Sequence, residues 1–182
     1  MRDGLQQLFL SDVDRPGEAR LLFHDNANKA PPDWSTDGRY LIYDHGGPSR
    51  LSGVWMLPMT EDDPSPAALI SAAFDQFDGH VSPDGRWISY TSNESGSYQI
   101  HIQSFPRLGA RRQVSPSGGY QARWRSDSEE LFYIAPDGML MAVSIERGSG
   151  DSPKLSKPEP LFRMPIGDLQ NALNVSWYSP AA

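Results

Sequence analysis

The sequence predicts an all-β protein made of β-propeller-type blades, each with four antiparallel strands. Three observations predict this fold: a recurring motif, segments of alternating polarity that flank it, and turn residues spread along the chain. The 182 residues include 16 Gly and 16 Pro, which suits many short strands joined by turns. Apolar residues make up 38% and aromatic residues 10%, so a folded core is expected rather than disorder.

The recurring motif is anchored by an aspartate. It reads "WSTDGRYLIY" from Trp34, "VSPDGRWISY" from Val81 and "WRSDSEELFY" from Trp124. The anchors are Asp37, Asp84 and Asp127, and each is followed four and six residues later by an apolar residue and a tyrosine: Leu41 and Tyr43, Ile88 and Tyr90, Leu131 and Tyr133. Positions four and six have the same parity, so both side chains are expected on one buried strand face.

Each anchor aspartate is expected in the turn between the first and second strands of its unit. Its carboxylate can accept a hydrogen bond from the backbone N–H two residues later. Gly38 and Gly85 follow the first two anchors and tolerate a positive φ angle. The third anchor is followed by Ser128, so we expect that turn to differ.

Third and fourth strands complete each unit. "MRDGLQQLFLSDV" from Met1 aligns with "NESGSYQIHIQSF" from Asn93, and "GVWMLPM" and "GMLMAVSI" take the same place in the other units. The fourth strands are "RLLF", "AALI", "RRQV" and "PLF". A unit of about 45 residues with four short strands cannot bury both of its faces alone, which favours stacked propeller blades. A β-sandwich is the main alternative, but it does not predict this period.

The predicted organisation is a single propeller domain or fragment over residues 1–182. We expect a half blade at 1–30, blades at 31–73, 74–115 and 116–163, and the start of a further blade at 164–182. Closed rings contain roughly four to eight blades, so an incomplete propeller is expected, as a fragment of a larger bacterial protein or as a small or open ring. Open blade edges predict self-association.

Composition excludes several classes of function. A net charge of -7 argues against a nucleic-acid partner, and the absence of cysteine excludes disulfides and thiolate metal sites. The four histidines, His24, His45, His80 and His101, show no metal-ligand spacing, so neither a metal nor a cofactor is expected. His101 alternates with isoleucines and is expected to point outward from its strand.

No apolar run approaches about 18 residues, so no membrane span is expected in this chain. The N-terminal stretch lacks a signal-peptide pattern. The compartment would be periplasmic or extracytoplasmic if a parent protein carries an upstream signal or membrane segment, and cytoplasmic otherwise.

The run "FDGHVSPDGRWISYTSNESGSYQIHIQSFP" resembles the WD-repeat-like propeller repeats of the TolB group. Continued through "GYQARWRSDSEELFYIAPDGMLMAVSI", it resembles the C-terminal propeller of large bacterial signalling proteins, which often follows a serine/threonine kinase or a DNA-binding transcriptional domain. The resemblance covers about residues 1 to 180 and implies a propeller fold. The chain has no Gly-rich nucleotide loop, "HRD" or "DFG", so a kinase would lie outside it.

We predict a non-enzymatic module that binds a protein or small-molecule ligand on a loop face. Alternatives are the C-terminal sensor or regulatory domain of a membrane-associated serine/threonine kinase, and the propeller part of a peptidase-like hydrolase, although the chain has no "GxSxG" elbow.

The resemblance implies that two classes of loop build this face. One class joins each fourth strand to the next blade, at residues 25–30, 73–79 and 115–121, and the other joins second and third strands, at residues 44–52, 92–97 and 135–138. Exposed aromatic and polar side chains in such loops are typical binding anchors. The candidates are Asn26, His45, Phe77, His80, Asn93, Glu94, Tyr120 and Gln121; no residue is assigned a catalytic role.

Overall fold

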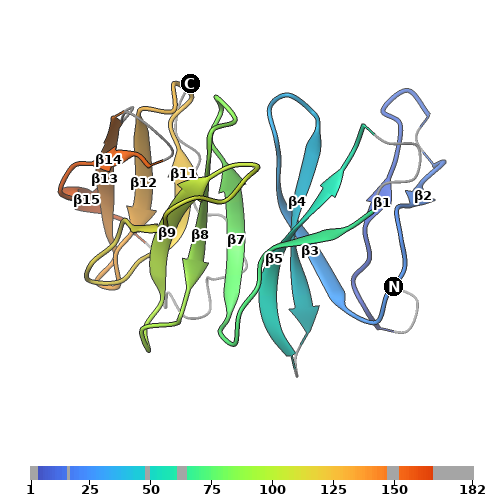
Figure 1. Cartoon of the computed structure of the whole chain (residues 1–182), viewed down its shortest axis with the longest axis horizontal. Coiled ribbons are helices and arrows are strands. Elements are labelled where there is room, and N and C mark those ends of the chain that lie inside the picture. The colour runs from blue at the N-terminus through green and yellow to red at the C-terminus, as the bar shows by residue number, and fades with distance from the viewer. Residues whose placement is uncertain (1–3, 16, 48–49, 61–64, 147–151, 166–182) are drawn as a thin grey trace.

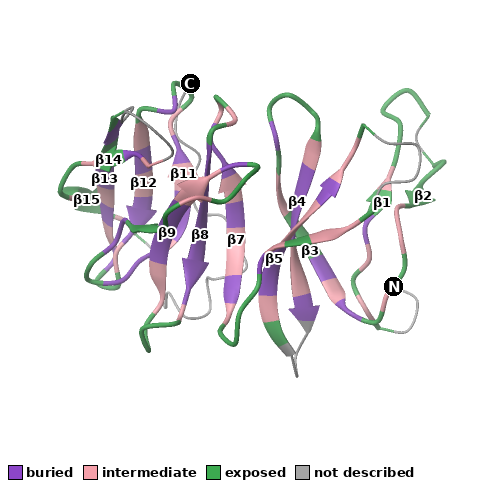
Figure 2. Cartoon of the chain, in the orientation of Figure 1, coloured by how far each residue is buried: buried purple, intermediate pink, exposed green. Residues whose placement is uncertain are grey.

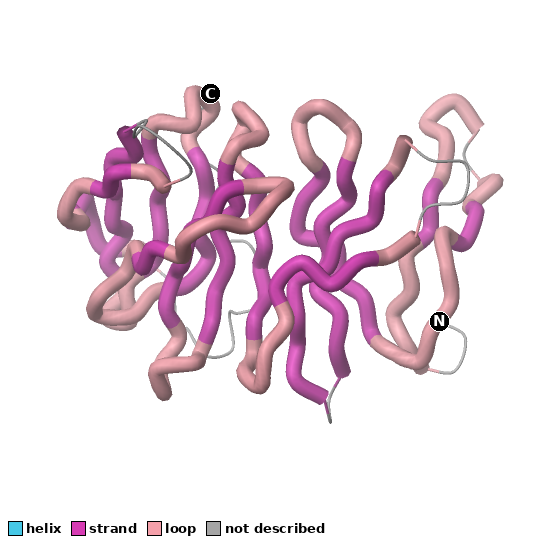
Figure 3. Tube along the Cα trace, viewed as in Figure 1, coloured by secondary structure: helices cyan, strands magenta, loops and turns pink. Residues whose placement is uncertain are grey.

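The computed structural model describes residues 4–15, 17–47, 50–60, 65–146 and 152–165, with the side chains of residues 47 and 50 left out. Among these residues the secondary structure is strands β1 to β15 and turns, and none of it is helical. Four antiparallel sheets follow one another in chain order from the N-terminal to the C-terminal side of the molecule (Figures 1 and 3). The predicted all-β fold is confirmed.

The first sheet pairs β1 (Phe9–Leu10) with β2 (Arg20–Leu21). The second contains β3 (Asn28–Trp34), β4 (Tyr40–Gly47), β5 (Arg50–Pro58) and β6 (Ala67–Ile70). The third contains β7 (Gln76–Val81), β8 (Trp87–Ser92), β9 (Gln99–Ser104) and β10 (Arg112–Gln113). In both four-stranded sheets the strands pair in chain order, as expected for propeller blades.

The fourth sheet has five strands instead of the predicted four. It contains β11 (Tyr120–Trp124), β12 (Glu130–Ile134), β13 (Met139–Glu146), β14 (Lys154–Leu155) and β15 (Glu159–Arg163). Strands β14 and β15 share the edge of β13, where β14 pairs with its end and β15 with its start. Pro158 stands between the two strands, and a proline cannot donate a ladder hydrogen bond. The predicted blade start at 164–182 lies mostly outside the described residues.

Three hydrophobic clusters lie between consecutive sheets. Leu8 packs against residues of the second sheet, the second sheet packs against the third, and the third packs against the fourth. Figure 2 shows buried residues along the central strands of the sheets and exposed residues in the turns. The six repeat residues predicted to be buried are buried: Leu41, Tyr43, Ile88, Tyr90, Leu131 and Tyr133. The second and third sheets are therefore each covered on both faces by their neighbours, so burial of these positions requires the adjacent blades.

The aspartate turns have the predicted hydrogen bonds. The carboxylates of Asp37, Asp84 and Asp127 accept a hydrogen bond from the backbone N–H two residues later, at 3.0, 3.2 and 2.9 Å. The expectation that the third turn differs is wrong. Ser128 adopts a φ of 65°, comparable with 73° at Gly38 and 71° at Gly85. Its hydroxyl accepts a hydrogen bond from the Asp84 N–H at 2.9 Å, so the serine links the turns of two adjacent sheets.

The position three residues before each anchor is less uniform than the repeat suggests. Val81 and Trp124 are 7% and 8% exposed, whereas Trp34 is 42% exposed. The Trp34 indole donates to the Gly38 carbonyl at 3.0 Å and so covers its own turn. The Trp124 indole instead donates to the His80 carbonyl at 3.0 Å and bridges two sheets.

Strands β3, β7 and β11, the first strands of the second, third and fourth sheets, each contain a β-bulge at an equivalent repeat position. The register shifts between Ala30 and Asp33 in β3, between Phe77 and His80 in β7, and between Tyr120 and Arg123 in β11. Two bulges contain a residue with positive φ, Asp78 at 56° and Gln121 at 53°. A bulge adds one unpaired residue and re-aims the side chains beside it. The three bulges therefore set how side chains project from these inner strands.

Candidate functional site

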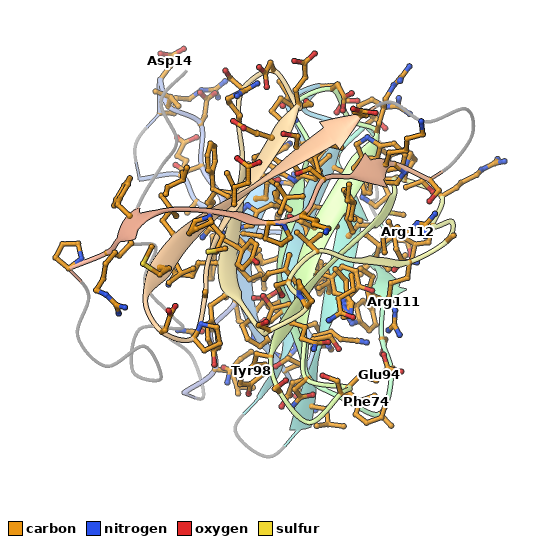
Figure 4. All side chains as sticks on the ribbon, turned by 90° about the vertical axis from the view of Figure 1, so that its left-hand side faces the viewer. Asp14, Phe74, Glu94, Tyr98, Arg111 and Arg112 are labelled. Carbon is orange, nitrogen blue, oxygen red and sulfur yellow. The ribbon has the colours of Figure 1, made fainter. Side chains whose placement is uncertain are left out.

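An aromatic surface formed by Phe77, Tyr98 and Tyr120 lies at one end of the sheets. The Tyr98 ring is 5.5 Å from the Phe77 ring and 5.8 Å from the Tyr120 ring, measured between centroids. All three side chains are partly exposed. Figure 4 shows Tyr98 at the lower end of the molecule, together with Glu94 and Phe74 and opposite Asp14. Aromatic side chains in such a partly exposed group offer a large contact area to a partner.

The backbone around Tyr98 is fixed by the loop that leads into the following blade. The Gly119 N–H donates to the Tyr98 carbonyl at 2.9 Å, and the Ile100 N–H donates to the Ser115 hydroxyl at 2.7 Å. A side chain at Gly119 would approach Tyr133 to 2.7 Å, so glycine is needed for this close packing. The aromatic surface is therefore held in place before any partner binds.

Next to Phe77 along β7 begins a group of charged residues that we call the inner-strand charge cluster. Asp33, Asp78, His80 and Arg123 come from the bulged strands β3, β7 and β11, and Asp44 joins them from β4. Strand β3 contacts β7, and β7 contacts β11. Asp33, His80 and Arg123 occupy equivalent repeat positions, each directly before Trp34, Val81 or Trp124.

Asp78 is the centre of the cluster. Its carboxylate accepts hydrogen bonds from Arg123 Nη1 at 3.1 and 3.2 Å, and it lies 3.0 Å from His80 Nε2. Burial alone would raise the pKa of Asp78, but the contacts with His80 and Arg123 outweigh it and lower that pKa. Asp78 is therefore a charged carboxylate with two basic partners from two inner strands.

Asp44 and Asp33 have different surroundings. Both carboxylate oxygens of Asp44 accept from the Asp78 N–H, at 3.0 and 3.2 Å, and burial raises the pKa of Asp44 to about 7. The hydrogen bond opposes this rise, and the charge of Asp78 adds to it. Asp33 accepts from the Val81 N–H at 2.7 Å, and burial raises its pKa despite the nearby His80 and Arg123.

Two further polar groups tie neighbouring elements together. His45 Nε2 lies 2.8 Å from Asp25 Oδ2, and its ring stacks on Trp55 at 4.4 Å. The buried Lys29 ammonium contacts Asp25 and donates to Gln7 Oε1 at 2.9 Å. These contacts join the first sheet to the second.

The third sheet is tied to the second in a similar way. The Asp75 N–H donates to Asn93 Oδ1 at 2.9 Å, and the Asp75 carboxylate accepts from the Ser52 N–H at 3.0 Å. Asn93 therefore supports Asp75, the residue that makes the contact between the two sheets.

The eight candidate residues are only partly brought together. Phe77 and Tyr120 meet at Tyr98, and His80 joins the charge cluster, whereas Glu94 pairs with Arg111 and Asn26 is exposed in a separate loop. Five candidates lie on strands rather than in loops, because the hairpins and bulged strands extend further than expected: His45, Phe77, His80, Tyr120 and Gln121.

Sequence reasoning missed five residues of this region: Asp33, Asp44, Asp78, Tyr98 and Arg123. The repeat itself contained a signal for Asp33 and Arg123, which share the position of His80. Asp44 and Asp78 lie within the predicted loop ranges 44–52 and 73–79, but nothing in the sequence singles them out, because their mutual contact crosses between sheets. The repeat gives no signal for Tyr98 either, which contacts Tyr120 of the next sheet.

The expected outward orientation of His101 is wrong. The residue is 5% exposed, and its ring packs on Tyr90 with centroids 5.7 Å apart. Neighbouring structure covers both faces of β9, so alternation along this strand does not place every second residue in solvent. Burial lowers the pKa of His101 to about 4, and the charge of Arg111 adds to the effect. Within the described ranges, no cluster of three or more His, Asp or Glu side chains could hold a metal ion.

Comparison with known structures now defines the class of fold, a TolB-like β-propeller. A protein assigned as TolB in Agrobacterium tumefaciens matches with a TM-score of 0.65 and 18% identity over 89% of this chain. TolB from Acinetobacter baumannii matches with a TM-score of 0.57 and 16% identity over 88% of this chain. The chain spans 58% and 38% of these two structures.

A structure of prolyl endopeptidases overlaps with a TM-score of only 0.42, which is too low to support any inference. No protein-family model matches the sequence, and no curated protein does either. In the described part of the chain, no helix has the length and apolar character needed to cross a bilayer. At these identities the comparisons support the fold alone.

Proposed function

We propose that the chain is a non-enzymatic module that binds a protein partner at the aromatic surface and the adjoining inner-strand charge cluster. The observation that carries the proposal is the convergence of Phe77, Tyr98 and Tyr120, which come from two sheets and remain partly exposed. A ligand-sensing role within a larger bacterial signalling protein is proposed on the resemblance of the repeats alone.

The geometry suits binding for two reasons. Gly119 and Ser115 fix the backbone beside Tyr98, so little conformational entropy is lost when a partner docks. Asp78, which directly follows Phe77, contacts His80 and Arg123 and so provides polar groups adjoining the aromatic surface. A combination of aromatic anchors and polar groups is typical of binding hot spots.

The histidines on this face favour binding over catalysis. His45 and His80 direct Nε2 at Asp25 and Asp78, respectively. A histidine that activates a nucleophile must also place its second ring nitrogen within hydrogen-bond reach of a hydroxyl or thiol, and neither histidine makes such a contact among the described residues. These two contacts fix the orientation of the imidazole rings against neighbouring carboxylates.

The test is selection of a phage-displayed random peptide library on the full chain, followed by affinity measurements on the selected synthetic peptides. Tyr120→Ala and Phe77→Ala should each weaken binding about thirtyfold, as expected for a hot-spot loss of about 2 kcal/mol. The matched control is Phe162→Ala, which removes a 56% exposed aromatic side chain from β15 and should leave the affinity unchanged. Selected peptides that bind both aromatic variants as tightly as the wild type would refute this docking site.

A further inference from the structure

A cleft with a volume of about 450 Å³ lies between the third and fourth sheets. Its lining comes from the Asp84 turn, from the Asp127 turn, and from the end of β13 at residues 144–146. The Asp84 turn follows the end of β7, whereas Phe77 lies near the start of that strand. The cleft is therefore separate from the aromatic surface, and the proposed docking does not use it.

The buried part of the lining combines two apolar side chains with one hydroxyl. Trp87 and Ile145 are 5% and 6% exposed, and both belong to the hydrophobic cluster between the two sheets. Ser128 is 6% exposed, and its hydroxyl accepts from the Asp84 N–H. Ligand sites typically have a largely apolar lining with a few polar groups that fix orientation. The base of the cleft can therefore pack against the hydrocarbon part of a ligand.

Trp87 also has a hydrogen-bond donor that the protein leaves unused. No described residue accepts from its indole N–H, and the Nε1 atom retains some access to solvent. The indoles of Trp34 and Trp124, in contrast, each donate to a backbone carbonyl at 3.0 Å. A donor on a side chain this buried is costly to leave without an acceptor. Because Trp87 lines the cleft, an acceptor oxygen of a bound molecule can reach it from there.

The cleft carries an excess of negative charge. Five carboxylates line it: Asp84, Asp127, Glu129, Glu130 and Glu146. Among the described residues, Arg125 is its one basic side chain, and it contacts Asp127 at 2.7 Å and Glu130. Glu129 lies 3.9 Å from Arg125, and Glu146 forms no ion pair with any described residue. Such a charge balance beside a buried apolar surface favours a positively charged ligand.

We propose that this cleft binds an organic cation with a nearby carbonyl group, as presented by an arginine residue in amide linkage. The guanidinium group is held by Glu129 and Glu146, and the hydrocarbon chain packs on Ile145. The carbonyl oxygen accepts from Trp87 Nε1 and supplies the missing hydrogen-bond partner. A free amino acid would bring its own carboxylate into an acidic cleft, so a capped residue fits better. This site is independent of the proposed docking function, and either can fail without the other.

Nuclear magnetic resonance on the isotope-labelled full chain follows the Trp87 indole directly, and Trp87→Phe assigns its signal. Titration with Nα-acetyl-arginine amide should shift that signal saturably. The matched ligand is Nα-acetyl-citrulline amide, which has nearly the same shape without the charge and should bind at least about tenfold more weakly. An unchanged Trp87 signal in the arginine amide titration would overturn the proposal, as would equal affinity for the two amides. The wild-type titration needs no variant to fold.

Exposed carboxylates provide the matched variants. Glu129→Gln combined with Glu146→Gln should weaken binding of the arginine amide about tenfold, since each exposed ion pair contributes about threefold. The control, Glu159→Gln, removes an exposed carboxylate of the same sheet that does not line the cleft, and it should leave the affinity unchanged. Equal losses in the double variant and the control would show general attraction to an acidic protein and overturn the site.

A capped peptide with one central arginine among glycines distinguishes two sources of this ligand chemistry. Tighter binding of the peptide than of the arginine amide would assign the cleft to a basic segment of a protein. Equal or weaker binding of the peptide would assign it to a small organic cation. Failure of both ligands to shift the Trp87 indole would refute the site and leave docking at the aromatic surface untouched.

Discussion

The contact between Gly79 in β7 and Val54 in β5 makes a sharp test of how closely the second and third sheets pack. A Cβ atom at Gly79 would lie 2.6 Å from Val54 Cγ1 and 3.1 Å from Ile42 Cγ2, whereas ordinary contacts lie at 3.4–4 Å. Gly79→Ala therefore requires a retreat of nearly 1 Å in a close-packed core, and we expect a loss of about 2 kcal/mol in the free energy of unfolding. For a chain of this size, that lowers Tm by about 4–8 °C.

A double-mutant cycle with Val54→Ala isolates this contact. Val54 is fully buried, so Val54→Ala alone should cost about 2 kcal/mol. In the double variant the new methyl group occupies part of the space that Val54 vacates, so the combined loss should be about 1.5 kcal/mol smaller than the sum of the single losses. Urea unfolding followed by circular dichroism gives all four free energies. If the loss in the double variant equals the sum of the two single losses to within about 0.5 kcal/mol, the close approach of the two sheets is refuted.

Three other features lead to measurable outcomes. Ser128→Ala removes the hydroxyl that accepts from the Asp84 N–H and keeps the positive φ, so it should lower the free energy of unfolding by about 1 kcal/mol. Ser128→Gly loses the same hydrogen bond but relieves the strain of the positive φ, so it should be nearly neutral. Equal losses for the two variants in urea unfolding would contradict this reasoning. Buried His101 resists protonation when folded, so stability should fall by up to about 3 kcal/mol between pH 6.5 and pH 4, and His101→Phe should flatten this pH dependence of urea unfolding. The isolated chain should self-associate through open sheet edges, and a concentration-independent monomer mass by light scattering would contradict this prediction.

The fold could be predicted from the sequence because a blade is specified locally. The aspartate of each turn contacts a backbone N–H two residues away, and the tyrosine six residues later is buried in all three copies. Both features depend on spacing within one unit, and a repeat makes that spacing visible. Prediction from spacing was wrong where a residue contacts another unit. The Ser128 hydroxyl contacts the turn of the neighbouring sheet, and the sequence of its own unit does not indicate that contact.

The candidate site was harder to predict because its contacts cross between sheets. Asp44 and Asp78 are 34 residues apart and meet only after β4 and β7 have packed together. Strand alternation also misled the interpretation of His101, since it assumes one solvent-facing side and both faces of β9 are covered. A comparison of equivalent repeat positions would have found Asp33, His80 and Arg123 together.

The order of the strands has a consequence for how the chain reaches its native state. In the second and third sheets, each strand pairs with the strand that precedes or follows it in the sequence. Most backbone ladders therefore close short loops, which lowers the entropic barrier to folding relative to β proteins with distant strand pairing. Each sheet can form as soon as its own residues leave the ribosome. Docking onto the previous sheet then buries one of its faces, and the next sheet covers the other. We therefore expect folding to proceed one sheet at a time along the chain.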